Sequence, residues 1–586
     1  MPTRFAPMHS DRHRPDRCPR QLLLLAALAT GTIALAAGCA RPGTGPAEQP
    51  ADAVLYARVI TMDPSVERAK GLAIREGRIV RVASPEALRP LVGPDTKIFN
   101  WRRYTVVPGL IDAHVDLLAL GETMVGLDLE DSGGMDDIAS RVRAVLAERG
   151  LGKQRWIVGY GWDEQRFRES TAVDRAKLDE VAPARPILLF RADRRSALAN
   201  GEALRLAGLD RGSADPPGGR LGRRSDGNLS GLLTGRAVKV VQRLLPTHGT
   251  EVRRALLKAA LGRLVEAGYT TVHDMGGDSE TWEALRALAV QGELPIRVLA
   301  SVPASDPLLP TLLANGPQVG LFDQHLTLRT VRLDLDGELG AQTAQLLEPY
   351  ADAVGETGLA ISSSEELTEL AQRSYEAGFQ LAIHASGDGA VRRVLDVLEA
   401  LRPSWSRWDA VRPRLEGVDL VHPDDVSRFG KLQLLASLQP ARASRQIHWL
   451  GDRLGEERLE RAHPWGSLER AEAPFALGSG APELPADPRT VFTAAVNRED
   501  ETGWPPGGWK PMERLRAPEA LRGLTSRAAW AGFEEEQKGS IRPGKLADLT
   551  VFSRDILYTD PEDLYRLRVL GTIVGGRIKF RTRHLR

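Results

Sequence analysis

The sequence contains very little cysteine. Only Cys18 and Cys39 occur in 586 residues, which is too few for a disulfide framework or a cysteine-ligated metal cluster. The sequence also lacks an excess of charge of either sign, because it contains 78 Lys and Arg and 77 Asp and Glu, for a net charge of +1. Without a basic surface or a Gly-rich phosphate loop after a strand, no nucleic acid is expected as a partner. The 42% of hydrophobic residues suffice for a large core, and the length exceeds one ordinary domain.

The N-terminus has the pattern of a secretory signal. Several arginines precede the apolar run Leu22–Leu35, and small residues follow it up to Cys39. The ending LAAGC resembles that of bacterial lipoproteins, which are cleaved before the cysteine and acylated on it. We therefore expect a lipoprotein signal peptide over residues 1–39 and a flexible linker over 40–50, where Pro and Gly occur without large apolar residues. An uncleaved anchor is the alternative, although the run is shorter than the roughly 20 residues of a spanning helix.

These features predict an exported protein that is lipid-anchored to the cell envelope through Cys39. The residue after the cysteine is Ala40 rather than Asp, which resembles lipoproteins sent to the outer membrane of a two-membrane bacterium. The expected partners are the membrane, reached through the lipid anchor, and a small-molecule substrate or ligand.

Strand-like and helix-like segments divide the rest of the chain into two parts. Short β-branched runs separated by turn residues occur in 51–106 and again in 539–582, and they predict one small composite β-sheet domain built from both ends. Between them, 107–538 alternates strand-like and helix-like segments. This pattern favours an α/β fold with a TIM-like (β/α) barrel and an inserted segment around 120–250.

Two helix boundaries in the barrel are marked by their residues. The helix predicted over Val252–Ala267 ends at Gly268, the residue type preferred where a helix stops. The helix predicted from about 365 to 377 follows Ser363, with Glu366 three residues later, which is the pattern of a capping box.

The segment PGLIDAHVD (Pro108–Asp116) carries the first candidate site residues. His114 and Asp116 stand two residues apart at the carboxyl end of the first barrel strand, so both side chains project to the same side. With IHASGDGA (Ile383–Ala390) and GSIRPGKLADLTVF (Gly539–Phe552), this segment resembles the amidohydrolase superfamily, specifically the third amidohydrolase family, which includes N-substituted formamide deformylases. The resemblance implies a divalent metal, usually zinc, that activates water to hydrolyse non-peptide carbon–nitrogen bonds.

Part of the metal site implied by this resemblance is present. The family pattern has a His-x-His pair, a lysine, one histidine on each of two later strands, and an aspartate on the last strand. This chain keeps His114 and His384, and it has Asp116 at the second histidine of the pair. These three side chains and a water would suffice for one divalent ion. In the alternative interpretation no metal is bound, and they are inherited polar residues that form hydrogen bonds in the barrel mouth.

Three other positions of the implied site differ. Arg332 stands at the lysine, Gly417 follows Glu416 where a histidine is expected, and Gly480 stands at the aspartate that takes the proton from water. A guanidinium stays protonated and cannot form the bridging carbamate, and glycine has no side chain. Two hypotheses follow. The chain is an amidohydrolase whose base is not identified, or it is a non-catalytic protein that binds a ligand or a partner.

Arginines replace family lysine or histidine residues at three positions, Arg195, Arg332 and Arg442. Fixed guanidinium groups could supply the positive charge otherwise provided by a metal, and they would bind a carboxylate or phosphate through paired hydrogen bonds. In the alternative interpretation, these arginines form internal salt bridges with nearby aspartates.

Overall fold

We analysed a computed structural model, which describes residues 49–147, 156–168, 172–246, 248–500 and 502–585. The predicted signal peptide, with Cys39, and nearly all of the predicted linker lie outside these residues. The described part belongs to one compact unit, Glu48–Arg586. Within it, no helix combines the length and the apolar character that crossing a membrane requires.

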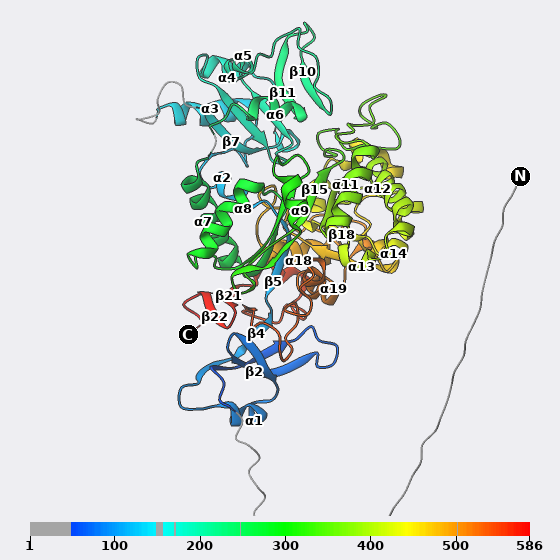
Figure 1. Cartoon of the computed structure of the whole chain (residues 1–586). Helices are drawn as coiled ribbons and strands as arrows, with labels where there is room; N and C mark the ends of the chain where they lie inside the picture. Colours follow the sequence, from blue (N-terminus) through cyan, green and yellow to red (C-terminus); the bar gives the residue numbers. More distant parts are fainter. Residues whose placement is uncertain (1–48, 148–155, 169–171, 247, 501, 586) are drawn as a thin grey trace, which may run out of the picture. The chain divides into compact units, whose positions relative to one another are not determined.

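The central element is a parallel barrel that is nearly closed (Figure 1). Its strands follow the order β19-β18-β17-β16-β15-β13-β12-β5. A bridge between Val115 and Ala481 brings the two edges together. The barrel strands are β5 (Leu110–Val115), β12 (Tyr269–Asp274), β13 (Arg297–Pro303), β15 (Leu326–Asp334), β16 (Gln380–Ala385), β17 (Arg414–Gly417), β18 (Leu435–Leu438) and β19 (Phe475–Leu477). The predicted TIM-like barrel is confirmed.

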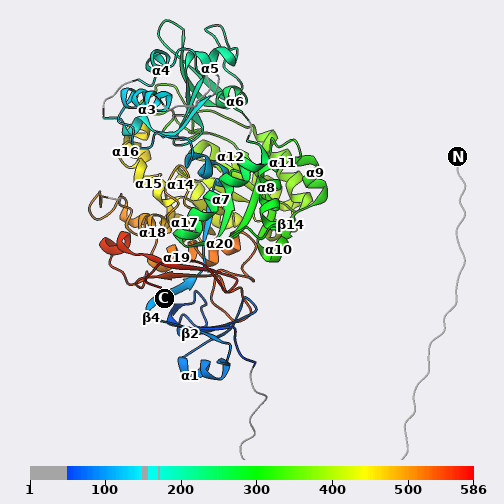
Figure 2. The same ribbon diagram turned by 90° about the vertical axis from the view of Figure 1, so that its left-hand side faces the viewer.

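The helices between the strands begin and end where their sequences predict. Helix α7 (Thr250–Ala267) buries one apolar face and ends at Gly268, whose φ of 107° is the left-handed conformation that favours glycine. Helix α11 (Ser364–Ala377) starts with the capping box formed by Ser363 and Glu366. Figure 2 shows these helices on the outside of the barrel strands.

Both ends of the described chain build one sheet, as predicted. Its order is β22-β21-β20-β4-β1-β2-β3, and the two ends meet where β20 pairs antiparallel with β4. The strands are β1 (Ala53–Ile60), β2 (Arg68–Arg75), β3 (Arg78–Val82), β4 (Lys97–Pro108), β20 (Leu549–Phe552), β21 (Val569–Val574) and β22 (Arg577–Arg581).

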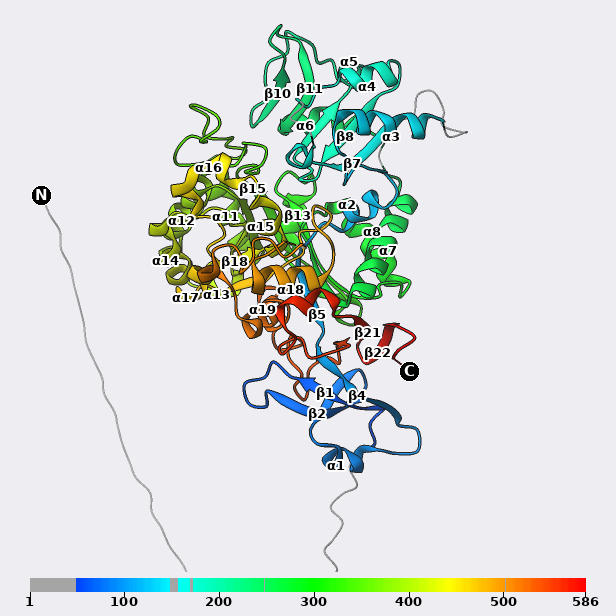
Figure 3. The ribbon, with the colours of Figure 1, turned by 180° about the vertical axis from the view of Figure 1, so that it is seen from behind.

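The inserted segment lies between β5 and β12 in the chain and forms a sheet of its own (Figure 3). The order of this sheet is β10-β11-β9-β8-β7-β6. Its strands are β6 (Leu127–Asp128), β7 (Ile157–Trp162), β8 (Ile187–Arg191), β9 (Ser196–Ala199), β10 (Gly219–Arg223) and β11 (Leu229–Gly235), and α6 (Arg236–Gln242) follows directly. This sheet confirms the predicted insertion into the barrel.

A buried ion pair joins the barrel to the composite sheet. Arg297 at the start of β13 donates two hydrogen bonds to Asp548, at 2.7 and 3.0 Å, and both side chains are 2% exposed. Burial alone would raise the pKa of Asp548, but the Arg297 guanidinium holds this pKa below its usual value.

We expect Asp548→Asn to lower the free energy of unfolding by roughly 3–5 kcal/mol, because Arg297 would keep its charge in a buried site without a counter-charge. Since the pKa of Asp548 is lowered in the folded state, the pair stabilises the fold above about pH 4, and this stabilisation is lost as the pH falls further. Urea denaturation at pH 7 measures the loss. The control is Lys258→Met, which removes an exposed pair with Glu293 and should cost less than about 1 kcal/mol. Similar losses of unfolding free energy in both variants would contradict a stabilising role for the buried Arg297–Asp548 pair.

Candidate functional site

A cavity of about 360 Å³ opens at the carboxyl ends of the barrel strands. The barrel and the inserted segment both line it, and the inserted segment contributes β8, α6 and the turn before β9. The predicted site residues all lie on its wall, namely His114, Asp116, Arg195, Arg332, His384, Arg442 and Gly480. The structure therefore brings these residues together in one cavity, and the contacts of each side chain decide what the cavity can do.

His114 is held by a buried carboxylate. Its Nδ1 lies 2.6 Å from Glu416 Oε2, and the other carboxylate oxygen forms an ion pair with Arg414. Burial would raise the pKa of Glu416, but Arg414 and then His114 lower it to about 2. An ionised carboxylate only accepts hydrogen bonds, so Nδ1 of His114 carries the proton and donates it to Glu416. In the neutral imidazole, Nε2 is then the nitrogen with the free lone pair.

Arg414 connects several strands inside the barrel. Its side chain is fully buried on β17, and Nη2 donates to Ala113 O on β5 at 2.7 Å and to Ser437 Oγ on β18 at 2.9 Å. Nη1 lies 3.1 Å from Nδ1 of His273 on β12. Burial, and then the charge of Arg414, lower the pKa of His273 well below its usual value, so its ring is neutral and accepts this bond.

Asp116 acts as a helix cap. Its carboxylate accepts from the backbone N–H of Ala119 at 2.8 Å, at the start of α2 (Leu117–Thr123). The carboxylate also packs against Gly276, where an added Cβ would lie 1.8 Å from Cγ of Asp116. Burial, and then the negative charge of Asp116, raise the pKa of the neighbouring Asp274 to about 7.

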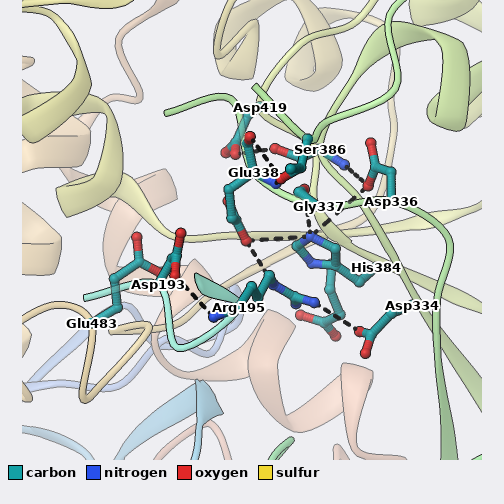
Figure 4. Close-up of polar contacts among 12 residues, drawn as sticks. Asp193, Arg195, Asp334, Asp336, Gly337, Glu338, His384, Ser386, Asp419 and Glu483 are labelled. Atoms are coloured by element: carbon teal, nitrogen blue, oxygen red, sulfur yellow. Dashed lines mark hydrogen bonds and ion pairs between the residues drawn. The ribbon is translucent and has the colours of Figure 1, made fainter. Parts of the chain in front are cut away.

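His384 is buried beside a loop carbonyl and a carboxylate (Figure 4). Its Nε2 lies 3.3 Å from Gly337 O and 3.4 Å from Glu338 Oε1. Burial and the charge of Arg195 lower the pKa of His384 to about 3, so the ring is neutral at neutral pH. A carbonyl only accepts, so Nε2 carries the ring proton.

Two of the three candidate arginines pair with internal carboxylates. Arg195 Nε lies 2.9 Å from Glu338 and its Nη1 lies 3.3 Å from Asp334, contacts that Figure 4 shows around Glu338. Arg442 contacts the other oxygen of Glu338 at 2.7 Å and Glu483 at 2.8 Å. The third arginine differs, because the side chain of Arg332 makes no hydrogen bond or ion pair with any residue that the structure describes.

The two glycines at expected ligand positions adopt left-handed conformations. Gly417 has a φ of 93° and Gly480 a φ of 73°. A Cβ at position 417 would lie 3.2 Å from Ala385 O and 3.4 Å from Cε1 of His384. A side chain at either position would therefore strain the backbone and would also crowd the neighbouring atoms.

Comparison with known proteins identifies the family. The model of the Amidohydrolase family matches residues 104–580, which is most of the chain. The chain belongs to the amidohydrolase family.

Relatives of this amidohydrolase cover nearly all of its folded part. It is 32% identical to Protein LONG AFTER FAR-RED 3 of Arabidopsis thaliana over 535 residues, covering 89% of this chain and 90% of that protein. It is 27% identical to N-substituted formamide deformylase of Arthrobacter pascens, covering 90% and 98% of the two chains. An uncharacterized metal-dependent hydrolase from Pyrococcus horikoshii has a similar structure, with a TM-score of 0.68, 25% identity, and coverage of 87% and 99%. These neighbours suggest a divalent metal as the group to test in this amidohydrolase.

The donors in this amidohydrolase's cavity do not fit that metal. Within the described residues, no group of three or more His, Cys, Asp and Glu side chains is arranged to hold an ion. Asp116 caps a helix, and Nε2 of His384 carries its proton toward Gly337. His114 keeps a free lone pair on Nε2 and His384 one on Nδ1, whereas one carboxylate oxygen of Asp116 is used at the start of α2. The metal set of His114, Asp116 and His384 stays a prediction.

Sequence analysis gave no role to Arg414 or to Lys239. Arg414 had a usable signal, because it stands two residues before Glu416 on a predicted strand, so both side chains point to the same side. Lys239 had no such signal. It lies on α6 of the inserted segment, and it lines the cavity because of how that segment folds, which the local sequence does not predict.

We expect Glu416→Gln to destabilise this amidohydrolase by roughly 3 kcal/mol at pH 7, because the variant loses the interactions that lower the pKa of Glu416 from 4.5 to about 2. A lowered folded-state pKa stabilises the protein above the unfolded value, so the difference from wild type should shrink as the pH falls from about 5 toward 2. Urea midpoints across this range measure it. The exposed control Glu293→Gln should change little at any pH. An equal penalty at pH 7 and pH 3 would contradict the ionised state of Glu416.

Proposed function

We propose that this protein is an exported amidohydrolase-family lipoprotein that binds a small molecule and has lost metal-dependent hydrolysis. One observation carries the proposal. The expected ligand positions Gly417 and Gly480 are left-handed glycines without a side chain, and one oxygen of Asp116 and Nε2 of His384 already have protein partners.

The chemistry of amide hydrolysis supports the same conclusion. A metal must polarise the carbonyl and activate water, and a base must take the proton of that water. Gly480 offers no acceptor where the family resemblance places the aspartate. Arg332 puts a permanent positive charge where the resemblance places the lysine, and this charge opposes a divalent cation in the same cavity.

The cavity remains suited to a small ligand. Its volume of about 360 Å³ lies within the roughly 300–1,000 Å³ of small-molecule sites. Apolar side chains such as Phe190, Met275 and Ile361 line it together with the charged groups. Because a relative is named N-substituted formamide deformylase, N-substituted formamides are the first neutral compounds to test for binding and for turnover.

The proposed location rests on the sequence alone. Leu22–Leu35 and the LAAGC ending at Cys39 support export and acylation, and Ala40 supports an outer-membrane position in a two-membrane bacterium.

Mass spectrometry of the purified chain should find metal well below one ion per chain, even after exposure to zinc, because the donors needed for tetrahedral coordination are missing or engaged. The double variant His114→Ala, His384→Ala should give the same metal content. One zinc per chain that disappears in the double variant would overturn the proposal and restore a mononuclear hydrolase as the leading hypothesis.

Cys39→Ala should release the protein from the membrane fraction and remove the lipid mass from its N-terminus, because the acylated residue is lost. Fractionation followed by intact-mass spectrometry of a bacterial expression host measures both. Cys18→Ala is the matched control and should leave the mature mass and the membrane association unchanged. A Cys39→Ala protein that stays with the membrane would favour an uncleaved anchor.

A further inference from the structure

Two cations face the cavity without a partner. Arg332 lies on β15 and Lys239 on α6, and neither side chain makes a hydrogen bond or ion pair with any part of the chain that the structure describes. The other cavity cations differ from these two. Arg194, for example, pairs with Glu122 and lies over the ring of Tyr160.

The two unpaired cations also affect each other. Lys239 lines the cavity, and its side chain is exposed to solvent there. Withdrawal from bulk water, followed by the positive charge of Arg332, lowers the pKa of Lys239. Two positive charges on the wall of one cavity repel one another.

The nearby carboxylates already have other partners. Asp334 forms an ion pair with Arg195, and Asp116 is hydrogen-bonded at the start of α2. Both weaken the repulsion at longer range, but neither lies within ion-pair distance of Arg332 or Lys239. Two like charges on the wall of one cavity, both without a side-chain partner, are the arrangement that an anion in contact with both would stabilise.

We propose that the cavity binds a small organic monocarboxylate, with its carboxylate held between Arg332 and Lys239. The proposal rests on the ligand-binding function proposed above and names the chemical class of its ligand. The planar guanidinium of Arg332 matches a carboxylate with two parallel hydrogen bonds, and Lys239 adds a point charge.

The rest of the cavity wall selects among anions. Asp116, Asp334 and Glu338 also line the cavity, so a dianion such as a phosphate ester would meet more repulsion than a monocarboxylate. The apolar side chains of Phe190 and Ile361 favour a ligand with a compact apolar body attached to the carboxylate.

The ligand would also connect two parts of the fold. Arg332 belongs to the barrel, whereas Lys239 belongs to the inserted segment. A carboxylate that contacts both would stabilise the inserted segment against the barrel, so the bound protein should unfold at a higher temperature than the free protein.

Isothermal titration of the full chain with matched pairs tests the class: benzoate against benzamide, and phenylacetate against phenylacetamide. We expect at least one carboxylate to bind at least tenfold more tightly than its amide, and more tightly than phenyl phosphate. Arg332→Gln and Lys239→Gln should each remove most of this preference. Arg236→Gln is the matched control, because Arg236 lines the same cavity but contacts Ser362 and Glu366, and it should keep the preference.

The outcomes separate this inference from the proposed function. If the chain is metal-free and no carboxylate binds more tightly than its amide, the proposed monocarboxylate site is wrong. The proposal that the protein binds a ligand without a metal would still stand. Preference for phenyl phosphate would likewise overturn the monocarboxylate class. If zinc is present at one ion per chain and EDTA abolishes carboxylate binding, the metal is the anion ligand, and both proposals fail. Melting temperatures of all variants check that each remains folded.

Discussion

The buried ion pair between Arg414 and Glu416 is the interaction on which the site depends. A guanidinium inside a barrel is tolerated only when its charge is balanced and its donors are satisfied. Glu416 supplies the charge, and Ala113, Ser437 and His273 accept the remaining donors. The same contacts tie strands β5, β12, β17 and β18 together beneath the cavity. The second oxygen of Glu416 then fixes the ring and the protonated nitrogen of His114, so the interior of the barrel determines what the cavity presents.

Most charged side chains around the cavity are paired with one another, and the exceptions among the cations are Arg332 and Lys239. Glu338 is shared by Arg195 and Arg442, Asp334 also pairs with Arg195, and Glu122 pairs with Arg194. Such groups hold loops in place and leave no capacity for a ligand. Among the cations that line the cavity, the side chains of Arg332 and Lys239 are the two without a partner in the described part of the chain, and Asp116 is a lining carboxylate that forms no ion pair there.

Local sequence signals predicted the fold well because they act over short distances. Gly268 ends α7, and the pair Ser363 and Glu366 starts α11, each through backbone groups a few residues away. The positions of the site residues were also predicted, because strand ends meet at one face of a barrel. Their partners were not. Arg195 finds Glu338 from 143 residues away and Arg442 from 104 residues away. Such pairing depends on the paths of loops, which a periodic sequence pattern does not predict. For the same reason, the sequence did not predict that Lys239 lines the cavity.

The missing metal ligands and the unpaired arginine belong to one consistent electrostatic arrangement. Replacing Gly417 by histidine would place a Cβ 3.4 Å from Cε1 of His384 and force a left-handed conformation on a bulky residue. A divalent cation in this cavity would also meet Arg332, whose charge repels it. Installing an aspartate at position 480 alone leaves that repulsion in place. In the proposed site, the unpaired charges of Arg332 and Lys239 favour an anion over a metal cation, while the neighbouring Arg195 and Arg442 are held by carboxylate pairs that need no metal.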